Sequence, residues 1–237
     1  ERERERERDV LTCRVTVWES STLDRLSSDI RERYDIFQSV FRDIDGSNTS
    51  QKERSRVGRE DQSLTYGEVE YLSFIDILKR TGACHGDVFY DLGCGAGKAV
   101  ISAALSGIQF MRCVGLEILP GLCDCARSAI SKVKGLHGGN IHNIPMMEIR
   151  ESDILTADWS AADVLYISSI CFSDNFMQSI LEKCSDLKPG TTLITLKLPD
   201  NYENILELEH QHWYKMSWGR IMVYILRRTN NRYRVRD

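Results

Sequence analysis

The chain has 237 residues, of which 42% are hydrophobic and 28% are charged, and its formal net charge at pH 7 is −4. A chain of this length can bury the core of one α/β domain with an N-terminal extension. Its acidic balance excludes an electrostatic match of the whole chain to DNA, and none of its apolar runs approaches the roughly 20 residues that a transmembrane helix needs.

Cysteine and histidine spacing bears on metals and on the cellular compartment. The eight cysteines include no C-x-x-C pair, and Cys123 and Cys125 stand on a predicted helix where positions two apart point to different faces. The five histidines show no ligand spacing either. The charged N-terminus differs from a signal peptide. We therefore expect reduced thiols, no metal site, no membrane segment, and a location in the nucleus or cytoplasm.

The sequence divides into an N-terminal extension, a main domain and a basic tail, at residues 1–62, 63–228 and 229–237. The extension opens with a strict Glu-Arg alternation over residues 1–8, typical of a disordered or solvated segment. Between residues 23 and 44, apolar side chains recur at three and four positions and predict one amphipathic helix that packs on its own domain. Residues 45–60 are polar and contain glycine, which predicts a loop.

Helical patterns alternate with short apolar runs through the main domain. In chain order they predict a helix at 66–80, a strand at 88–92, a helix at 98–106, a strand at 113–117, a helix at 120–134, strands at 146–151 and 164–168, a helix at 174–184 and a strand at 191–198. Two last strands, 212–217 and 220–226, flank a tight hairpin turn at Trp218-Gly219.

The strand at 88–92 leads into three glycines at alternate positions, Gly93, Gly95 and Gly97, with Asp91 just upstream. Glycines let the backbone turn sharply and a ligand approach closely. A dinucleotide fold spaces its glycines as G-x-G-x-x-G and binds a pyrophosphate, which a carboxylate would repel. The spacing found here favours a ligand with a positive centre and no phosphate, such as S-adenosyl-L-methionine. The alternative is an ordinary glycine-rich turn.

Two further acids stand at the ends of the next two strands. Glu117 follows Gly97 by 20 positions, where nucleotide-binding α/β folds accept the hydroxyls of a ribose. Asp153 would accept from the adenine amine, with Ile154 against the ring. A solvent-facing loop acid is the alternative for Glu117, and a surface turn is the alternative for Asp153.

These patterns together predict the fold class. Alternating helices and strands give a parallel sheet with its ligand at the carboxyl ends of the strands. The C-terminal hairpin inserts one antiparallel strand. We expect the Rossmann-like α/β fold of class I methyltransferases: a seven-stranded, mostly parallel sheet with helices on both faces.

A more specific resemblance rests on short motifs between residues 63 and 198. Leu64-Thr-Tyr-Gly-Glu-Val69 is similar to the Tyr-Gly-Glu loop of the Dot-one family (disruptor of telomeric silencing), histone-lysine N-methyltransferases with the seven-strand fold. The segment 88–97 and Val114-Gly-Leu-Glu117 resemble the first two cofactor motifs of that family. Glu151-Ser-Asp-Ile-Leu155 matches its adenine segment in the Asp. The resemblance implies S-adenosyl-L-methionine as cofactor and a protein substrate, a histone in the nucleosome.

The resemblance also implies residues that act near the transferred methyl group. Tyr66, Gly67 and Glu68 would close over the methionine end of the cofactor, with Glu68 beside its amine. Where the family carries Asn-Asn-Phe-Ala-Phe after the fourth strand, this chain has Ser168-Ser-Ile-Cys-Phe172. The residues expected in catalysis are Tyr66, Ser168, Ser169 and Phe172, with Trp218 as a more distant candidate. Core packing is the alternative for Tyr66 and Phe172.

The chemistry requires little acid–base machinery. Methyl transfer to an amine is an in-line displacement in which the protein aligns the reacting groups. A lysine must first lose its proton, which burial in an apolar channel favours, so no catalytic triad is expected. The residues expected to contact the cofactor are Tyr66, Glu68, Asp91, Gly93, Cys94, Gly95, Gly97, Glu117, Ile118, Asp153, Ile154 and Ser168.

Three functions stay open. The first is a protein-lysine N-methyltransferase acting on a core histone. The second is a class I methyltransferase for another protein or a small molecule, which the paired serines and the acidic balance favour. The third is a catalytically silent, cofactor-binding module. The arginine-rich end of the chain, from Arg227 to Arg236, is either a weak nucleic-acid contact or a solvated tail.

Overall fold

The computed structural model describes residues 27–57, 67–136 and 143–230. The expectations for the Glu-Arg repeat, for Tyr66 and for the arginines at 232–236 fall outside these residues. Within the described ranges, no helix has both the length and the apolar character needed to cross a membrane.

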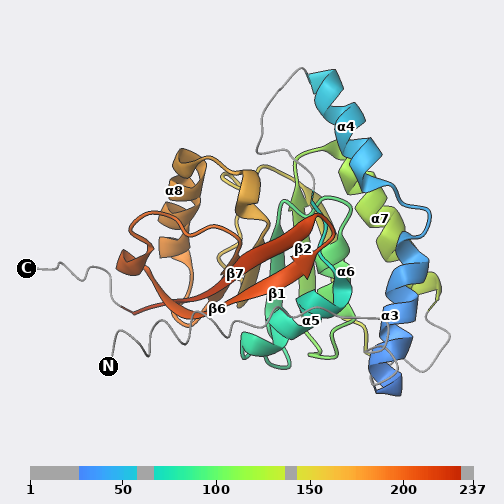
Figure 1. The fold of residues 1–237 in the computed structure, drawn as a ribbon, viewed down its shortest axis with the longest axis horizontal. Helices are drawn as coiled ribbons and strands as arrows, with labels where there is room; N and C mark the ends of the chain where they lie inside the picture. The colour runs from blue at the N-terminus through green and yellow to red at the C-terminus, as the bar shows by residue number, and fades with distance from the viewer. Residues whose placement is uncertain (1–26, 58–66, 137–142, 231–237) are drawn as a thin grey trace, which may run out of the picture.

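A seven-stranded sheet forms the centre of the molecule (Figure 1). Its strands lie side by side in the order β3-β2-β1-β4-β5-β7-β6. Neighbouring strands are parallel from β3 to β5, and β7 is antiparallel to both β5 and β6. The predicted fold class is therefore confirmed. In chain order the strands are β1 (Val88–Leu92), β2 (Arg112–Glu117), β3 (Met146–Glu151), β4 (Val164–Ile167), β5 (Thr192–Thr195), β6 (Leu206–Met216) and β7 (Gly219–Arg228).

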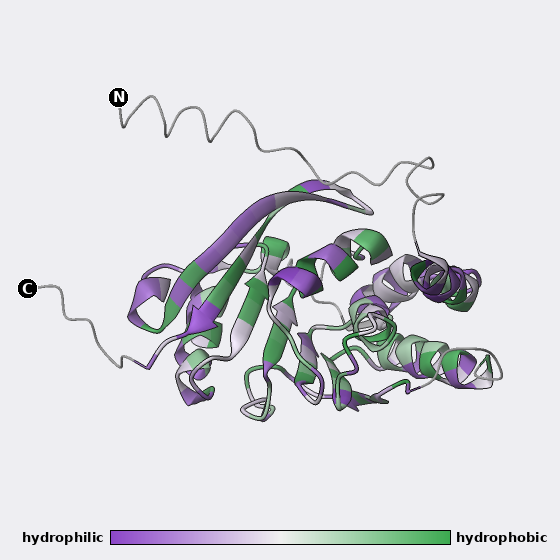
Figure 2. Ribbon diagram, turned by 90° about the horizontal axis from the view of Figure 1, so that it is seen from below, coloured by the Kyte–Doolittle hydropathy of each residue, from purple (hydrophilic) through white to green (hydrophobic). Residues whose placement is uncertain are grey.

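Helices cover both faces of the sheet. One face packs against α5 (Tyr71–Arg80), α6 (Lys98–Ala104) and α7 (Pro120–Gly135), and the other packs against α8 (Asp174–Lys183). All five residues of β1 are buried, because a central parallel strand has helices on both sides. Figure 2 shows the contrast in hydropathy: the middle strands are largely green, whereas the outer hairpin carries long purple stretches.

The N-terminal extension contributes two helices. The predicted amphipathic helix is α3 (Ser28–Phe41), somewhat shorter than expected, and its Phe37 and Phe41 are buried against the domain. The loop predicted at 45–60 is wrong, because α4 (Gly46–Val57) occupies most of it.

The missed signal for α4 was its cap. The carboxylate of Asp45 accepts a hydrogen bond of 2.9 Å from the backbone N–H of Asn48, which satisfies one of the free donors at the start of the helix. The carboxylate of Glu53 then accepts the backbone N–H of Gly121, 3.2 Å away in the first turn of α7. Docking on α7 thus holds a polar segment in a helical conformation.

Two boundaries in the main domain differ from expectation. Helix α5 begins at Tyr71 rather than at residue 66, and residues 67–70 approach it without helical structure. Strand β5 ends at Thr195, three residues early, because the Thr195 hydroxyl donates to the carbonyl of Lys197 at 2.9 Å and the chain turns there.

The C-terminal hairpin is longer than predicted, and its turn lies one residue earlier. Met216 pairs with Gly219, so the two turn residues are Ser217 and Trp218. The edge strand β6 also carries charged residues before residue 212, at Glu207 and Glu209, which obscured its pattern; an edge strand tolerates them because one side faces solvent.

The basic C-terminal segment begins inside the sheet. Arg228 is 5% exposed and donates to the carbonyls of Cys184 and Ser185, at 3.1 and 3.2 Å. Arg227 pairs with Glu209 at 2.7 Å. The expectation that these two arginines belong to a free basic tail is wrong, because both are used to fix β7.

Candidate cofactor and active site

A cavity of about 190 Å³ lies at the carboxyl ends of β1, β2, β3 and β4. Eleven of the residues predicted from the sequence line it: Glu68, Asp91, Gly93, Cys94, Gly95, Glu117, Ile118, Asp153, Ile154, Ser168 and Phe172. Gly97 and Ser169 do not. The residues from four strand ends and from the loop before α5 therefore converge on one hollow.

The glycine loop adopts the conformations that its spacing predicted. Gly93, Gly95 and Gly97 all have positive φ, at 86°, 53° and 85°. A Cβ added at Gly93 would meet nothing within 4 Å, so that position is open, whereas one added at Gly97 would lie 3.0 Å from the Cβ of Ala126. Gly97 therefore serves close packing of α6 on α7 and not the cavity wall.

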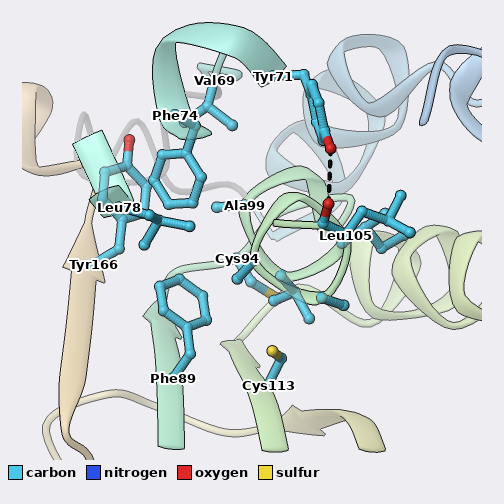
Figure 3. Packing of buried hydrophobic residues seen from close by; sticks show 14 of the residues in the cluster. Val69, Tyr71, Phe74, Leu78, Phe89, Cys94, Ala99, Leu105, Cys113 and Tyr166 are labelled. Atoms are coloured by element: carbon cyan, nitrogen blue, oxygen red, sulfur yellow. Dashed lines mark hydrogen bonds between the residues drawn. The ribbon is translucent and has the colours of Figure 1, made fainter. Parts of the chain in front are cut away.

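Cys94 is anchored in the core beneath the cavity. Its side chain packs on β2 so closely that a Cβ added at Gly115 would lie 2.6 Å from the Cys94 Sγ. Figure 3 shows it among the buried side chains, near Phe89 and Cys113. In the same cluster the hydroxyl of Tyr71 donates to the carbonyl of Leu105 at 2.8 Å, which ties α5 to the end of α6.

Glu117 holds the glycine loop and the start of α7 together. One carboxylate oxygen accepts the backbone N–H of Gly95 at 2.9 Å, and the other accepts those of Ile118 and Leu119 at 2.8 and 2.9 Å. A carboxylate offers about four acceptor positions. Three are taken here, so a vicinal diol would have to share or displace one of them.

Asp91 is a buried carboxylate with an unsatisfied oxygen. It is 2% exposed, and its Oδ1 has no hydrogen-bond partner among the described residues. Burial, and then the neighbouring charge of Glu117, raise the pKa of Asp91 well above its ordinary value. An unpaired carboxylate oxygen at a cavity wall fits a ligand that donates hydrogen bonds or carries positive charge.

Glu68 already has a cationic partner. Its carboxylate contacts the ammonium of Lys98, and both residues line the cavity. Lys98 also lies over the ring of Phe41 from α3, 5.3 Å from the ring centroid. The sequence did not point to Lys98. The sequence feature that could have identified Lys98 is its position directly after the last glycine, at a helix N-terminus, where positive charge is disfavoured.

The paired serines after β4 separate into two roles. Ser168 lines the cavity, whereas Ser169 is fully buried with its hydroxyl 2.8 Å from that of Thr195. The same Ser169 oxygen accepts the backbone N–H of Leu196 at 3.1 Å. Ser169 is thus placed to hold β5 against β4, and the expectation that it faces the site is wrong.

Aromatic side chains form an apolar wall beside Ser168. Phe172 packs edge-on against Phe176 with ring centroids 4.8 Å apart, and both line the cavity. The hydroxyl of Tyr166 also lines the cavity and is buried without a hydrogen-bond partner among the described residues; burial, and then the charge of Asp91, raise the pKa of Tyr166. Phe176 and Tyr166 were missed, because both read as ordinary core residues.

The segment after β3 closes another side. Ile154 is buried and lines the cavity, and the exposed Asp153 uses one carboxylate oxygen to accept the backbone N–H of Leu155 at 2.8 Å. Asp153 and the preceding Ser152 also line the cavity.

The tip of the C-terminal hairpin reaches the loop before α5. The hydroxyl of Ser217 donates to the carbonyl of Glu68 at 2.9 Å, and the Trp218 ring lies so close to Gly67 that a Cβ there would be 3.0 Å from it. Trp218 is 40% exposed and is not part of the cavity wall. Its contact with the site passes through Gly67.

Two negative observations delimit the site. No group of three or more His, Cys, Asp or Glu side chains arranged to hold a metal ion occurs in the described part of the chain. A larger, open hollow of about 800 Å³ lies where β4 and β5 begin, bordered by Trp159, Lys183 and Arg228, and it contains none of the predicted site residues.

The strand order and the cavity at the carboxyl ends define the fold of class I methyltransferases. A solved S-adenosylmethionine-dependent methyltransferase from Methanosarcina mazei shares this fold, with a TM-score of 0.53 and 14% identity, over 65% of this chain and 98% of that one. The family described as "Histone methylation protein DOT1" matches residues 57–216, more than half of the chain. The chain belongs to this family.

Several relatives of the chain share one name. "Histone-lysine N-methyltransferase, H3 lysine-79 specific" of Cryptococcus neoformans is 26% identical over 200 residues, which cover 73% of this chain and 30% of that protein. The Dictyostelium discoideum protein of the same name is 31% identical over 143 residues, 56% of this chain and 7% of that protein. The chain thus spans less than a third of the length of these relatives.

Proposed function

We propose that the chain is an S-adenosyl-L-methionine-dependent protein-lysine N-methyltransferase that acts on a histone in the nucleus. The observation that carries the proposal is the unsatisfied carboxylate of Asp91 at the wall of a cavity shaped by Gly93 and Gly95. Membership of the DOT1 family, whose relatives are named as histone-lysine methyltransferases, supports the choice of substrate.

The residues present fit this cofactor. When bound, it supplies an activated methyl group on a sulfonium. Asp91 and Glu68 offer carboxylates to a cationic amino-acid end, and Glu117 stands at the end of β2, where a ribose is bound in such folds. Ile154 offers an apolar surface and Asp153 an acceptor for an adenine ring. We infer these contacts from chemistry and position.

The chain's own residues would prepare the lysine. Its amine must be neutral to act as a nucleophile, and an apolar wall favours the neutral form by penalising the charged one. Phe172 and Phe176 provide that wall beside the cavity. The hydroxyls of Ser168 and Tyr166 can accept a hydrogen bond from the amine and fix its direction, which is the main task in an in-line transfer.

A second candidate is methylation of a protein other than a histone. Ser168 and Ser169 stand where the Dot-one family has paired asparagines, and only Ser168 reaches the cavity. A single hydroxyl offers a different pattern of donors from an amide. The net charge of −4 also gives no general attraction to nucleosomal DNA.

A transfer assay distinguishes these functions. The full chain is incubated with tritiated S-adenosyl-L-methionine and, in parallel, with nucleosomes, free core histones and a cell extract depleted of histones. We expect label in a histone, and its loss in Asp91→Asn. Label only in the depleted extract would favour the second candidate. Cofactor binding without label in any sample would leave a silent binding module.

A further inference from the structure

Lys98 occupies a position where a lysine is electrostatically unfavourable. It is the first residue of α6, directly after Gly97, and the N-terminus of a helix carries partial positive charge. A cation there is stabilised only by neighbours. Its place in the cavity wall makes its charge relevant to whatever binds there.

Two neighbours hold the Lys98 ammonium. The carboxylate of Glu68 contacts it directly, and the ring of Phe41 lies 5.3 Å away. The side chains of Lys98 and Glu68 are each 21% exposed, so solvent can reach the pair and the contact can be exchanged for another. Glu68 is carried on a loop segment and not on a helix or strand.

Lys98 is the one base among the described residues that line the cavity. The acids of that wall are Glu68, Asp91, Glu117 and Asp153. The amino-acid end of S-adenosylmethionine carries an ammonium, a carboxylate and a sulfonium: two positive charges and one negative. Lys98 is therefore the residue of the described wall whose charge complements the ligand's carboxylate, and the acids complement its positive charges.

We propose that Lys98 is a specificity-determining residue that binds the carboxylate of the ligand's amino-acid end. This inference rests on the proposed cofactor. When the ligand binds, the ion pair between Lys98 and Glu68 breaks and two new ones form. Lys98 then pairs with the ligand carboxylate and Glu68 with the ligand ammonium, so neither protein charge is left unpaired. The site then selects ligands that carry a free α-carboxylate.

The test uses three ligands and measures binding, so it needs no substrate protein. S-adenosylhomocysteine has the ammonium and the carboxylate of the amino-acid end but no sulfonium, its decarboxylated analogue keeps only the ammonium, and 5′-methylthioadenosine has neither group. By titration calorimetry, the wild type binds S-adenosylhomocysteine about 10-fold or more tightly than the decarboxylated analogue, the scale of one charge-assisted hydrogen bond. In Lys98→Met that ratio falls to about twofold or less.

The controls separate this role from a structural one. Affinity for 5′-methylthioadenosine stays within about twofold in Lys98→Met, because that ligand has no carboxylate to lose. Lys79→Met, an exposed lysine on α5, keeps the full ratio. Should Lys98→Met not fold, Lys98→Gln replaces it. An unchanged ratio in the folded variant overturns the role of Lys98. A wild type that does not bind S-adenosylhomocysteine overturns the proposed cofactor itself.

Discussion

Ser217 donates twice to the backbone carbonyl of Glu68, through its hydroxyl at 2.9 Å and its N–H at 3.3 Å. These bonds join the tip of the β6–β7 hairpin to the loop that carries one acid of the cavity. Ser217 in the hairpin and Glu68 at the cavity are 149 positions apart in sequence, and both bonds end on the same carbonyl oxygen. The position of the Glu68 carboxylate therefore depends on the hairpin.

Ser217→Ala removes the hydroxyl bond and leaves the backbone bond. A neutral hydrogen bond contributes about 0.5–1.5 kcal/mol, and this one is exposed, so we expect the affinity for S-adenosylhomocysteine to fall about two- to fivefold. Calorimetric titration measures it. Ser160→Ala, which removes an exposed hydroxyl bonded to Asp158, is the matched control and leaves affinity unchanged. Equal affinity in both variants would mean that the hairpin does not support Glu68.

Gly67→Ala tests the other half of this junction. The added Cβ would lie 3.0 to 3.3 Å from three carbons of the Trp218 ring, so the loop or the ring must shift. Overpacking costs about 1–3 kcal/mol, and because the shift moves the loop that carries Glu68, we expect weaker cofactor binding. Trp218→Leu in the same chain makes room and restores part of the affinity. If the double variant binds the cofactor no more tightly than Gly67→Ala, the contact with Trp218 is not the cause of the lost affinity.

Sequence patterns correctly predicted the elements in which burial or backbone conformation restricts the residue type at each position. The buried strand at 88–92 and the glycines after it were correct, because continuous apolar residues and positive φ leave few alternatives. The cavity residues at the strand ends followed from the parallel topology. Most of the predicted residues that line the cavity could be found in this way.

What the sequence could not reveal depends on contacts between distant segments. Helix α4 is polar throughout and is held by Asp45 and by docking of Glu53 on α7. Ser169 turns from the cavity because Thr195 offers it a partner 26 positions away. The Lys98–Glu68 pair and the hairpin tip on Gly67 likewise need the tertiary structure to be recognised.

Glu117→Gln tests the carboxylate that accepts hydrogen bonds from three backbone N–H groups. An amide has one acceptor oxygen and places an NH₂ where an acceptor stood, so at least one N–H, at Gly95 or at the start of α7, loses its partner. We expect a loss of unfolding free energy of about 1–3 kcal/mol in urea titrations. Cofactor affinity should fall about 10-fold or more, because the glycine loop is no longer held and the charged acceptor is gone.

Glu151→Gln is the matched control, since this exposed glutamate ends the adjacent strand β3 in register with Glu117. It should leave both stability and affinity at the wild-type level. A Glu117→Gln variant with wild-type stability would contradict the bracing role. Wild-type affinity with reduced stability would contradict its part in the ligand site.

Asp91→Asn should affect stability and binding in opposite directions. The carboxyl group is buried with an unpaired oxygen, and burial penalises its ionised form, which is the form present in the unfolded chain at pH 7; an amide bears no such penalty. We expect Asp91→Asn to unfold at higher temperature than the wild type at pH 7, about 2–4 °C for each kcal/mol gained in a domain of this size. The same variant should lose affinity for S-adenosylhomocysteine. Lower stability together with unchanged affinity would show that Asp91 is a structural acid.

The stability gain from Asp91→Asn should also depend on pH. Burial and the charge of Glu117 raise the pKa of Asp91, so the folded state keeps this proton to a higher pH than the unfolded chain, whose pKa is about 3.9. As pH rises between the two values the folded state binds more protons than the unfolded one, and stability falls. Below about pH 4 both states are protonated, and the acid resembles the amide.

The difference in unfolding free energy between variant and wild type should therefore be small at the lowest pH at which both fold, and it should grow as the pH approaches 7. Urea titrations at several pH values measure it, with the exposed Asp124→Asn as the matched control. A difference that stays constant across the range would mean that Asp91 carries the same charge in the folded and unfolded states at each pH, and its assignment as the buried acid of the site would fail.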